Sequence, residues 1–303
     1  MNWFFKATVF KVMSYLPFGN TVYSFLQNNL TRSLLVTRSR LLQKAEIGNL
    51  YWEKFEELGV SKESLKTHLD LGSGWHPTIP LLFEAYGVKR QFLCDVVPII
   101  TPATFKSTQS IFNQLVGEGK ICKCNPTPPN DRELGDLSEI MSVHGFSYHA
   151  PYFGIGSDQS GKIDFVSCTQ VLMHIDRPQL IECFKEMFKA LRPGGWFICT
   201  NHLFDIYSNT DKSISVYNHL RYSERFWRTL VNSKMMSFNR LKSRDYRELL
   251  ELSGFEIIEF HITHGDEADI KSLRSLKIHP EFSSRFSEKE LSEKHLYFVA
   301  RKP

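Results

Sequence analysis

The stretch from His68 to Thr78 holds the residues best placed to do chemistry, an acid followed by two glycines. Asp70 precedes Gly72 by two residues and Gly74 by four, and the residues before the turn are typical of a short buried strand. Glycine lets the backbone turn and approach a ligand without a Cβ atom in the way. Such a turn at the end of a parallel strand is where doubly wound folds bind nucleotides.

The spacing of the glycines argues against two other nucleotide sites. The dinucleotide fingerprint G-x-G-x-x-G requires a third glycine where this chain has Pro77. A P-loop requires Lys followed by Ser or Thr after the glycines, and no such pair follows Gly74. Neither a nicotinamide site nor a P-loop is therefore favoured.

A second acid, Asp95, ends another predicted buried strand at 91–95. A helix near Pro80 separates the two predicted strands and ends at Gly87. Because a carboxylate can accept two hydrogen bonds at once, an acid in this place suits the two hydroxyls of a ribose.

Polar side chains also follow two later predicted strands. Gln170 and His174 come after a strand at 162–168, and His202 and Asp205 come after a strand at 196–199. A hydroxyl group that accepts a transferred group must lose its proton, so His202 and Asp205 are candidate general bases. A helix cap beside a surface His explains the same two residues. His174 is a third candidate base, although a lone His near a helix start is more often a structural hydrogen-bonding group.

Periodicity predicts the remaining elements. The segments are a helix at 48–59, a helix at 102–116, a loop at 118–136, a short strand at 145–150, a helix from Asp176 to Leu191, a turn at 191–195, a helix around 246–250 and strands at 254–260 and 296–300. Alternating strands and helices predict an α/β fold with a mostly parallel sheet.

Taken together, these features resemble the class I S-adenosylmethionine-dependent methyltransferases. The first motif of that family is an acid, any residue, Gly, any residue and Gly, which matches Asp70 to Gly74. The order then continues through Asp95, Val171-Leu-Met-His-Ile175 and Leu191-Arg-Pro-Gly-Gly195. The resemblance implies a doubly wound, Rossmann-like sheet of seven strands with helices on both faces and an antiparallel last strand.

The resemblance also implies S-adenosylmethionine as the cofactor. Asp70, Gly72 and Gly74 would line its methionine part, Asp95 would hold its ribose, and Gln170 would lie at the edge that faces the methyl group. Trp75 and His76, inside the turn, would either shield the cofactor or pack under the next helix.

The sequence also bears on the group that accepts the methyl. Relatives that methylate adenine amino groups or glutamine amides carry Asn or Asp, then Pro-Pro and Tyr or Phe, after the fourth strand, and Ser167-Cys-Thr-Gln170 is not that motif. The chain, including the Trp75-His-Pro-Thr-Ile-Pro80 turn and the Asn239-Arg-Leu-Lys-Ser243 stretch, is similar to methyltransferases of bacterial polysaccharide and lipid-linked glycan pathways. This similarity makes O-methylation of a sugar or lipid hydroxyl the first hypothesis. Methylation of another small metabolite is the second, and a non-enzymatic cofactor-binding module is the third.

The predicted domains are a helical N-terminal extension at 1–47 and a methyltransferase domain at 48–303, with an insertion at 203–242 as a substrate lid. The insertion carries seven Lys and Arg against three acids, interleaved with Tyr217, Tyr222, Phe226 and Trp227. It suits an anionic or sugar-bearing acceptor, with rings stacking on the sugar. A solvated helix face with buried aromatic residues explains the same pattern equally well.

The N-terminal segment 1–45 contains no acid and carries six cations among many aromatic residues. Trp3, Phe4, Phe5 and Phe10 with Lys6 are typical of a helix on an anionic membrane surface. The alternative is a helical cap folded over the cofactor cleft. Membrane contact would place the protein at the inner face of the membrane.

The composition of the chain limits the class of protein and the kinds of ligand that these hypotheses allow. A chain of 303 residues with 42% hydrophobic and 23% charged residues is an ordinary globular composition. A net charge of +4 is too small to indicate nucleic acid. The six cysteines lack paired zinc spacings, so no metal site is predicted, and we interpret them as reduced thiols of a cytoplasmic protein.

Overall fold

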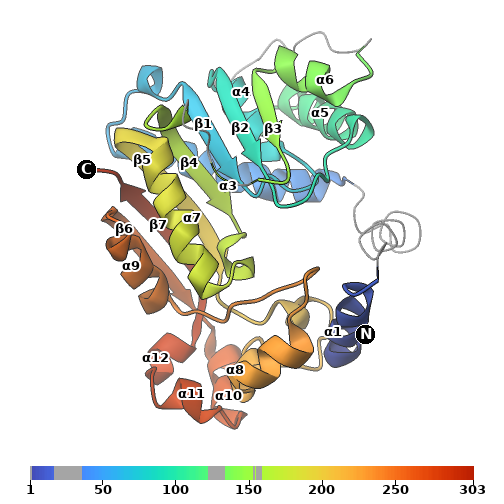
Figure 1. Ribbon diagram of the computed structural model, residues 1–303, viewed down its shortest axis with the longest axis vertical. Coiled ribbons are helices and arrows are strands. Elements are labelled where there is room, and N and C mark those ends of the chain that lie inside the picture. The colour runs from blue at the N-terminus through green and yellow to red at the C-terminus, as the bar shows by residue number, and fades with distance from the viewer. Residues whose placement is uncertain (1, 17–35, 122–133, 153, 155–158) are drawn as a thin grey trace. The chain divides into compact units, whose positions relative to one another are not determined.

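The computed structural model describes residues 2–16, 36–121, 134–152, 154 and 159–303 (Figure 1). The chain divides into two compact units. Unit 1 holds residues 1–33, 170–185 and 199–300, and unit 2 holds residues 34–169, 186–198 and 301–303. Most of the predicted loop at 118–136 lies outside the described residues.

In the described residues, seven strands form one sheet in the order β3-β2-β1-β4-β5-β7-β6. The strands are β1 Thr67–Leu71, β2 Arg90–Cys94, β3 Phe146–His149, β4 Ile163–Thr169, β5 Leu191–His202, β6 Glu256–His264 and β7 Glu293–Arg301. β1 pairs in parallel with β2 and β4, and β2 with β3, whereas the last strands are antiparallel. The predicted doubly wound α/β sheet is confirmed.

Helices connect the strands. The α-helices are α1 Trp3–Met13, α3 Arg38–Glu57, α4 Thr78–Ala85, α5 Pro102–Gly117, α6 Leu137–Val143, α7 Arg177–Ala190, α8 Glu224–Phe226, α9 Ser243–Leu252, α10 Glu267–Ser275, α11 Pro280–Ser283 and α12 Glu288–Leu291. Short 3₁₀ turns are η1 Lys62–Ser64, η3 Leu172–His174, η4 Ile206–Asn209 and η5 Asn218–Arg221, and η6 Trp227–Val231 is a π-helical turn.

The core of unit 2 gathers residues from four helices and two strands. Leu41 of α3, Leu82 of α4, Phe105 of α5, Ile140 of α6 and Phe146 of β3 belong to one buried cluster. Figure 1 shows α5 and α6 beside β3 in this unit. Burial of these apolar faces holds β2 and β3 in place, and β1, with the turn that follows it, is positioned by its pairing with β2.

His68 ties β1 to both of its neighbours. Its ring nitrogens lie 2.8 Å from Gln91 Oε1 on β2 and 2.8 Å from Ser167 Oγ on β4. Burial lowers the pKa of His68 to about 3, so the ring is neutral at physiological pH. This bridge helps to fix the strand that carries Asp70.

One helix begins earlier than the sequence pattern predicts. The helix expected from Gly48 begins at Arg38, because the Thr37 side chain accepts a hydrogen bond from the Arg40 amide and caps it. Leu41, Ala45 and Gly48 then form one buried face. The predicted domain boundary after residue 47 falls inside this helix.

The predicted turn at 191–195 is wrong, because these residues are the first part of β5. The Gly194 amide donates to the Lys302 carbonyl at 2.8 Å, and the Lys302 amide donates to the Gly195 carbonyl at 2.9 Å. Gly194 has a φ of +73°, which a glycine adopts without strain. The segment therefore pairs with the chain end instead of leaving the sheet.

Helix α1 packs within unit 1 by one face. Trp3 and Ala7 belong to a buried cluster with Tyr207, Trp227 and Phe238 of the insertion. The Trp3 amide also donates to Asp211 Oδ2 at 2.7 Å. The extension is therefore anchored on the insertion.

The other face of α1 is exposed. Phe5 is 62% exposed, whereas Trp3 and Phe10 are 7% and 6% exposed. Trp3 and Phe10, two of the four aromatic residues that the membrane-surface hypothesis placed toward lipid, are thus core residues. No described helix is long and apolar enough to cross a membrane.

Candidate active site

The glycine turn after β1 is held against β2 by its backbone. The Gly72 and Ser73 amides donate to the Cys94 carbonyl at 2.8 and 3.2 Å. Gly72 and Gly74 have φ values of +79° and +67°, a region that residues with a Cβ atom rarely adopt. The turn therefore needs both glycines at the positions where the motif has them.

Asp70 lies buried at the start of this turn. Its Oδ1 accepts a hydrogen bond from Ser167 Oγ at 2.8 Å, and its side chain is enclosed in unit 2. Burial raises the pKa of Asp70, while hydrogen bonds from Ser167 and Ser73 and the charge of Lys44 act in the opposite direction.

Asp95 is hydrogen-bonded to the same turn. The Gly74 amide donates to its Oδ2 at 3.0 Å, and the Val96 amide donates to its Oδ1 at 2.8 Å. Burial raises its pKa, and these backbone donors lower it. The structure thus brings Asp70, Gly72, Gly74 and Asp95 together at one point of unit 2.

Lys44 of α3 is a site residue that sequence reasoning missed. Its Nζ donates to the His76 carbonyl at 3.2 Å, and Asp70 and Asp95 both act on its charge. Burial lowers the pKa of Lys44 and the two carboxylates raise it. The sequence feature that could have identified Lys44 is its spacing: it lies three residues after Leu41 and four before Gly48, on the buried face of α3.

The two residues inside the turn are half-buried. Trp75 and His76 both have intermediate exposure, and His76 Nδ1 lies 2.9 Å from Thr108 Oγ1 of α5. Helix α5 therefore orients the His76 ring. Shielding of a cofactor and packing under the next helix both stay predictions for these two residues.

Gln170 and His174 lie in unit 1. Gln170 has a φ of +59°, and its amide donates to the Thr200 carbonyl at 2.8 Å. His174 Nδ1 lies 2.6 Å from the Ser237 carbonyl, which can only accept, so Nδ1 carries the proton. Burial lowers the pKa of His174, and its lone pair is left on Nε2.

His202 is the last residue of β5. Its Nδ1 lies 3.0 Å from Nδ1 of His295 on β7, a residue that the sequence analysis did not single out. Burial lowers the pKa of His202 to about 4, with smaller contributions from His295 and His174. A neutral imidazole at pH 7 can act as a proton acceptor.

Asp205 is a fully buried N-cap of η4. Its Oδ1 accepts from the Tyr207 amide at 2.9 Å, and its Oδ2 accepts from Asn218 Nδ2 at 3.1 Å. Burial raises the pKa of Asp205 to about 6. These bonds match the helix-cap interpretation of Asp205, and they occupy both of its oxygens.

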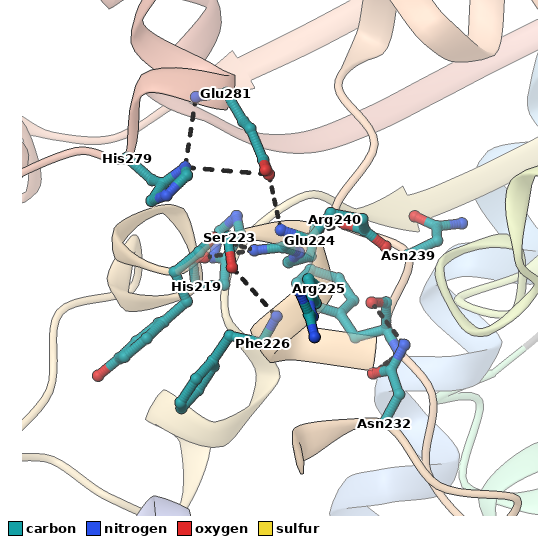
Figure 2. Close-up of polar contacts among 12 residues, drawn as sticks. His219, Ser223, Glu224, Arg225, Phe226, Asn232, Asn239, Arg240, His279 and Glu281 are labelled. Carbon is teal, nitrogen blue, oxygen red and sulfur yellow. Dashed lines mark hydrogen bonds and ion pairs between the residues drawn. The ribbon is translucent and has the colours of Figure 1, made fainter. Parts of the chain in front are cut away.

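A buried cation, Arg240, holds parts of the insertion together (Figure 2). Arg240 Nη1 donates to the carbonyls of His219 and Tyr222 at 3.0 and 2.7 Å, and Arg240 also pairs with Glu224. Lys242 Nζ donates to the Leu291 carbonyl at 3.1 Å. These two cations are therefore structural.

The other cations of the insertion are exposed: Lys212, Arg221, Arg225, Arg228 and Lys234. Of the four aromatic residues singled out earlier, Tyr217 and Trp227 are fully buried, and Tyr222 and Phe226 are half-buried. Among the residues that the structure describes, no group of three or more His, Cys, Asp or Glu side chains is arranged to hold a metal ion.

A family model described as a methyltransferase domain matches residues 43–260. The chain belongs to this methyltransferase family. With its sheet order and its acid–glycine turn, the methyltransferase is an S-adenosylmethionine-dependent enzyme of class I. None of the curated proteins matched the methyltransferase sequence.

Several solved structures are similar in fold. An S-adenosylmethionine-dependent methyltransferase from Mesorhizobium loti has 14% identity and a TM-score of 0.42, covering 78% of this chain and 90% of that one. One from Methanosarcina mazei has 13% identity and a TM-score of 0.43, covering 78% and 92%. A phosphoethanolamine N-methyltransferase from Haemonchus contortus, bound to S-adenosylhomocysteine, has 14% identity and a TM-score of 0.40, covering 78% and 49%.

Proposed function

We propose that the methyltransferase binds S-adenosylmethionine at the glycine turn of unit 2 and methylates a hydroxyl group of a sugar or a lipid-linked glycan. The observation that supports cofactor binding best is the bond from the Gly74 amide to Asp95, which joins the acid–glycine motif to the second acid. Bound S-adenosylmethionine supplies an electrophilic methyl group on a sulfonium, whose C–S electron pair remains on sulfur when the methyl group leaves.

The residues at the turn fit this cofactor. Asp95 accepts backbone hydrogen bonds from Gly74 at Oδ2 and from Val96 at Oδ1, and its carboxylate has further acceptor capacity for a ribose hydroxyl. Lys44 brings a positive charge that suits a carboxylate, and Asp70 brings a negative charge that suits an amino group. A Cβ atom added at Gly74 would meet only the Lys44 ammonium, at 3.7 Å, so the backbone at this point is open.

His202 is the preferred general base. The proton of the acceptor hydroxyl would go to its imidazole, and the electron pair of the broken O–H bond would stay on the oxygen that receives the methyl group. Asp205 is the second candidate, although both of its oxygens already accept hydrogen bonds inside the insertion. His174, also neutral by burial, is the third.

Exposed cations support an anionic acceptor. Arg221, Arg225 and Arg228 lie on the insertion beside the half-buried rings of Tyr222 and Phe226. Arginine suits phosphate or carboxylate groups, and an aromatic ring can stack on a sugar. The exposed face of α1 supports a place at the inner face of the membrane, close to a lipid-linked acceptor.

Titration calorimetry tests the proposed cofactor. We expect heat with S-adenosylhomocysteine and none with NADH. Asp95→Ala should weaken S-adenosylhomocysteine binding by about 1–3 kcal/mol, because it removes the charged acceptor of the ribose hydroxyls. Glu118→Ala, which removes an exposed acid of the same unit, is the control and should bind like the wild type. Binding of NADH alone would refute the proposed function, and an unchanged affinity in Asp95→Ala would remove Asp95 from the site.

A further inference from the structure

Two histidines of neighbouring strands share a hydrogen bond in unit 1. His202 ends β5 and His295 is the third residue of β7, and their Nδ1 atoms are 3.0 Å apart. The rings meet edge to face, with centroids 5.0 Å apart, and Phe204 lies 4.8 and 5.5 Å from them. The ring of Phe204 therefore packs against both imidazoles.

A hydrogen bond between two imidazole nitrogens requires one N–H group and one lone pair. Two Nδ1–H groups would repel each other at this distance, so the two rings must have opposite tautomers. The titratable groups that act on the pair are His174 of η3 and Lys294 of β7. Burial and these neighbours lower the pKa of both rings, which keeps them neutral at pH 7.

The second ring nitrogen of His202, Nε2, is then available to bind a proton. In the described part of the chain, Nε2 of His202 makes no hydrogen bond, whereas its Nδ1 is held by His295. The tautomer of an imidazole is set by the bond that its other nitrogen makes. The state of His295 therefore decides whether Nε2 of His202 holds a proton or a lone pair.

We propose that His295 is a positioning residue that accepts the Nδ1 proton of His202 and so leaves the His202 Nε2 lone pair free to act as a base. The assignment rests on the proposed function, because it concerns the general base proposed there. In this arrangement His295 has its own proton on Nε2. When Nε2 of His202 takes the acceptor proton, the imidazolium is still hydrogen-bonded through Nδ1.

NMR of the full chain labelled with ¹⁵N in its histidine rings tests the proposal without an acceptor. Long-range ¹H–¹⁵N correlations at pH 7 separate the two tautomers, and the single variants His202→Gln and His295→Gln assign the signals. We expect the Nδ1–H form for His202 and the Nε2–H form for His295. The opposite pair of tautomers would overturn the proposal.

Two substitutions at His295 separate positioning from packing. His295→Phe keeps a ring but no acceptor, and should shift the tautomer ratio of His202 by roughly five- to tenfold toward Nε2–H, since one net hydrogen bond is lost. His295→Asn supplies a carbonyl acceptor and should restore the Nδ1–H form. A His202 signal that stays unchanged in His295→Phe would overturn the proposal, and His295→Asn tests it if the first variant fails to fold.

A control distinguishes this result from the proposed function. His261→Phe removes an exposed imidazole of β6 and should leave the His202 signals unchanged. Binding of S-adenosylhomocysteine, measured by calorimetry on His295→Phe, should equal that of the wild type. A protein that shows the expected tautomers but does not bind S-adenosylhomocysteine would refute the function and leave the pairing intact.

Discussion

Asp205 illustrates, at the scale of one residue, how burial changes the behaviour of a carboxylate. The sequence offers it as a base or as a helix cap, and both oxygens accept hydrogen bonds from the insertion itself. A cap of this kind stabilises the first turn of η4 by supplying an acceptor for an amide that has no partner in the turn. Burial raises its pKa to about 6, so ionisation of Asp205 carries a cost in the folded state.

The substitution Asp205→Asn should reveal this cost as a pH-dependent difference in stability between the wild type and the variant. The pKa of Asp205 is about 6 in the folded protein, against an ordinary value of 3.8. Below pH 3.8 its carboxyl is protonated in both states and does not destabilise the fold. The destabilisation grows as pH rises from 3.8 and is complete above the folded pKa. Between pH 4 and pH 7 the wild type should lose up to about 3 kcal/mol of unfolding free energy relative to the variant, since one pKa unit corresponds to about 1.4 kcal/mol. Urea unfolding across this range measures the difference.

Asp211→Asn is the matched control with the opposite sign. Hydrogen bonds from Ser213 and from the Trp3 amide lower the pKa of Asp211. Its stabilising contribution is therefore present above the ordinary pKa and is lost as pH falls through the folded value. If the stability gap between wild type and Asp205→Asn did not vary with pH, the buried ionisation would be disproved.

At the scale of elements, α1 presents one face to the insertion and the other to solvent. Trp3 stacks on Trp227 with ring centroids 5.9 Å apart, and its ring also meets Tyr207 and Tyr222. Phe5, two residues later, is exposed. The helix therefore carries two aromatic residues with different roles within one turn.

The pair Trp3→Ala and Phe5→Ala tests this division. We expect Trp3→Ala to lower the free energy of unfolding of the cooperative unit that includes α1 by about 3–5 kcal/mol, because a large buried ring leaves a cavity. Phe5→Ala should change it by less than about 0.5 kcal/mol, as exposed substitutions usually do. Urea unfolding followed by tryptophan fluorescence measures both. Equal effects of the two substitutions would mean that α1 is not anchored through Trp3.

At the scale of the whole molecule, the exposed face of α1 leads to a test of membrane attachment. Phe5, Val12 and Leu16 are more than half exposed, and burial of apolar side chains in a headgroup layer would be favourable. We expect the full chain to sediment with vesicles that contain anionic lipid, less so with neutral vesicles, and less at high salt. The triple variant Phe5→Ser, Val12→Ser and Leu16→Ser should lose at least roughly tenfold in partitioning.

The control removes exposed apolar residues elsewhere. Val143→Ser and Leu252→Ser replace side chains of α6 and α9 that are 45% and 64% exposed, and these variants should partition like the wild type. Equal partitioning of the triple variant and the wild type would exclude attachment through α1. Substitution is preferable to truncation near residue 45, since Lys44 and α3 belong to the glycine-turn site.

The local sequence determined the acid–glycine turn and the strands around it. Gly72 and Gly74 are required by positive φ angles, and the apolar runs before Asp70 and Asp95 specify β1 and β2, so these features could be predicted from neighbouring residues alone. The methyltransferase fold followed from their order. The prediction of where β5 begins was wrong, because its first residues pair with Lys302, far along the chain.

Only the tertiary structure decided which distant side chains meet. Lys44 reaches the two acids from α3, and His202 meets His295 because antiparallel β7 returns beside β5. Burial of Trp3 likewise depends on a partner more than 200 residues away, since its amide bonds to Asp211. Local periodicity reports which face of an element is apolar, but the partner of that face, and with it the charge state of the enclosed groups, depends on how the chain folds back on itself.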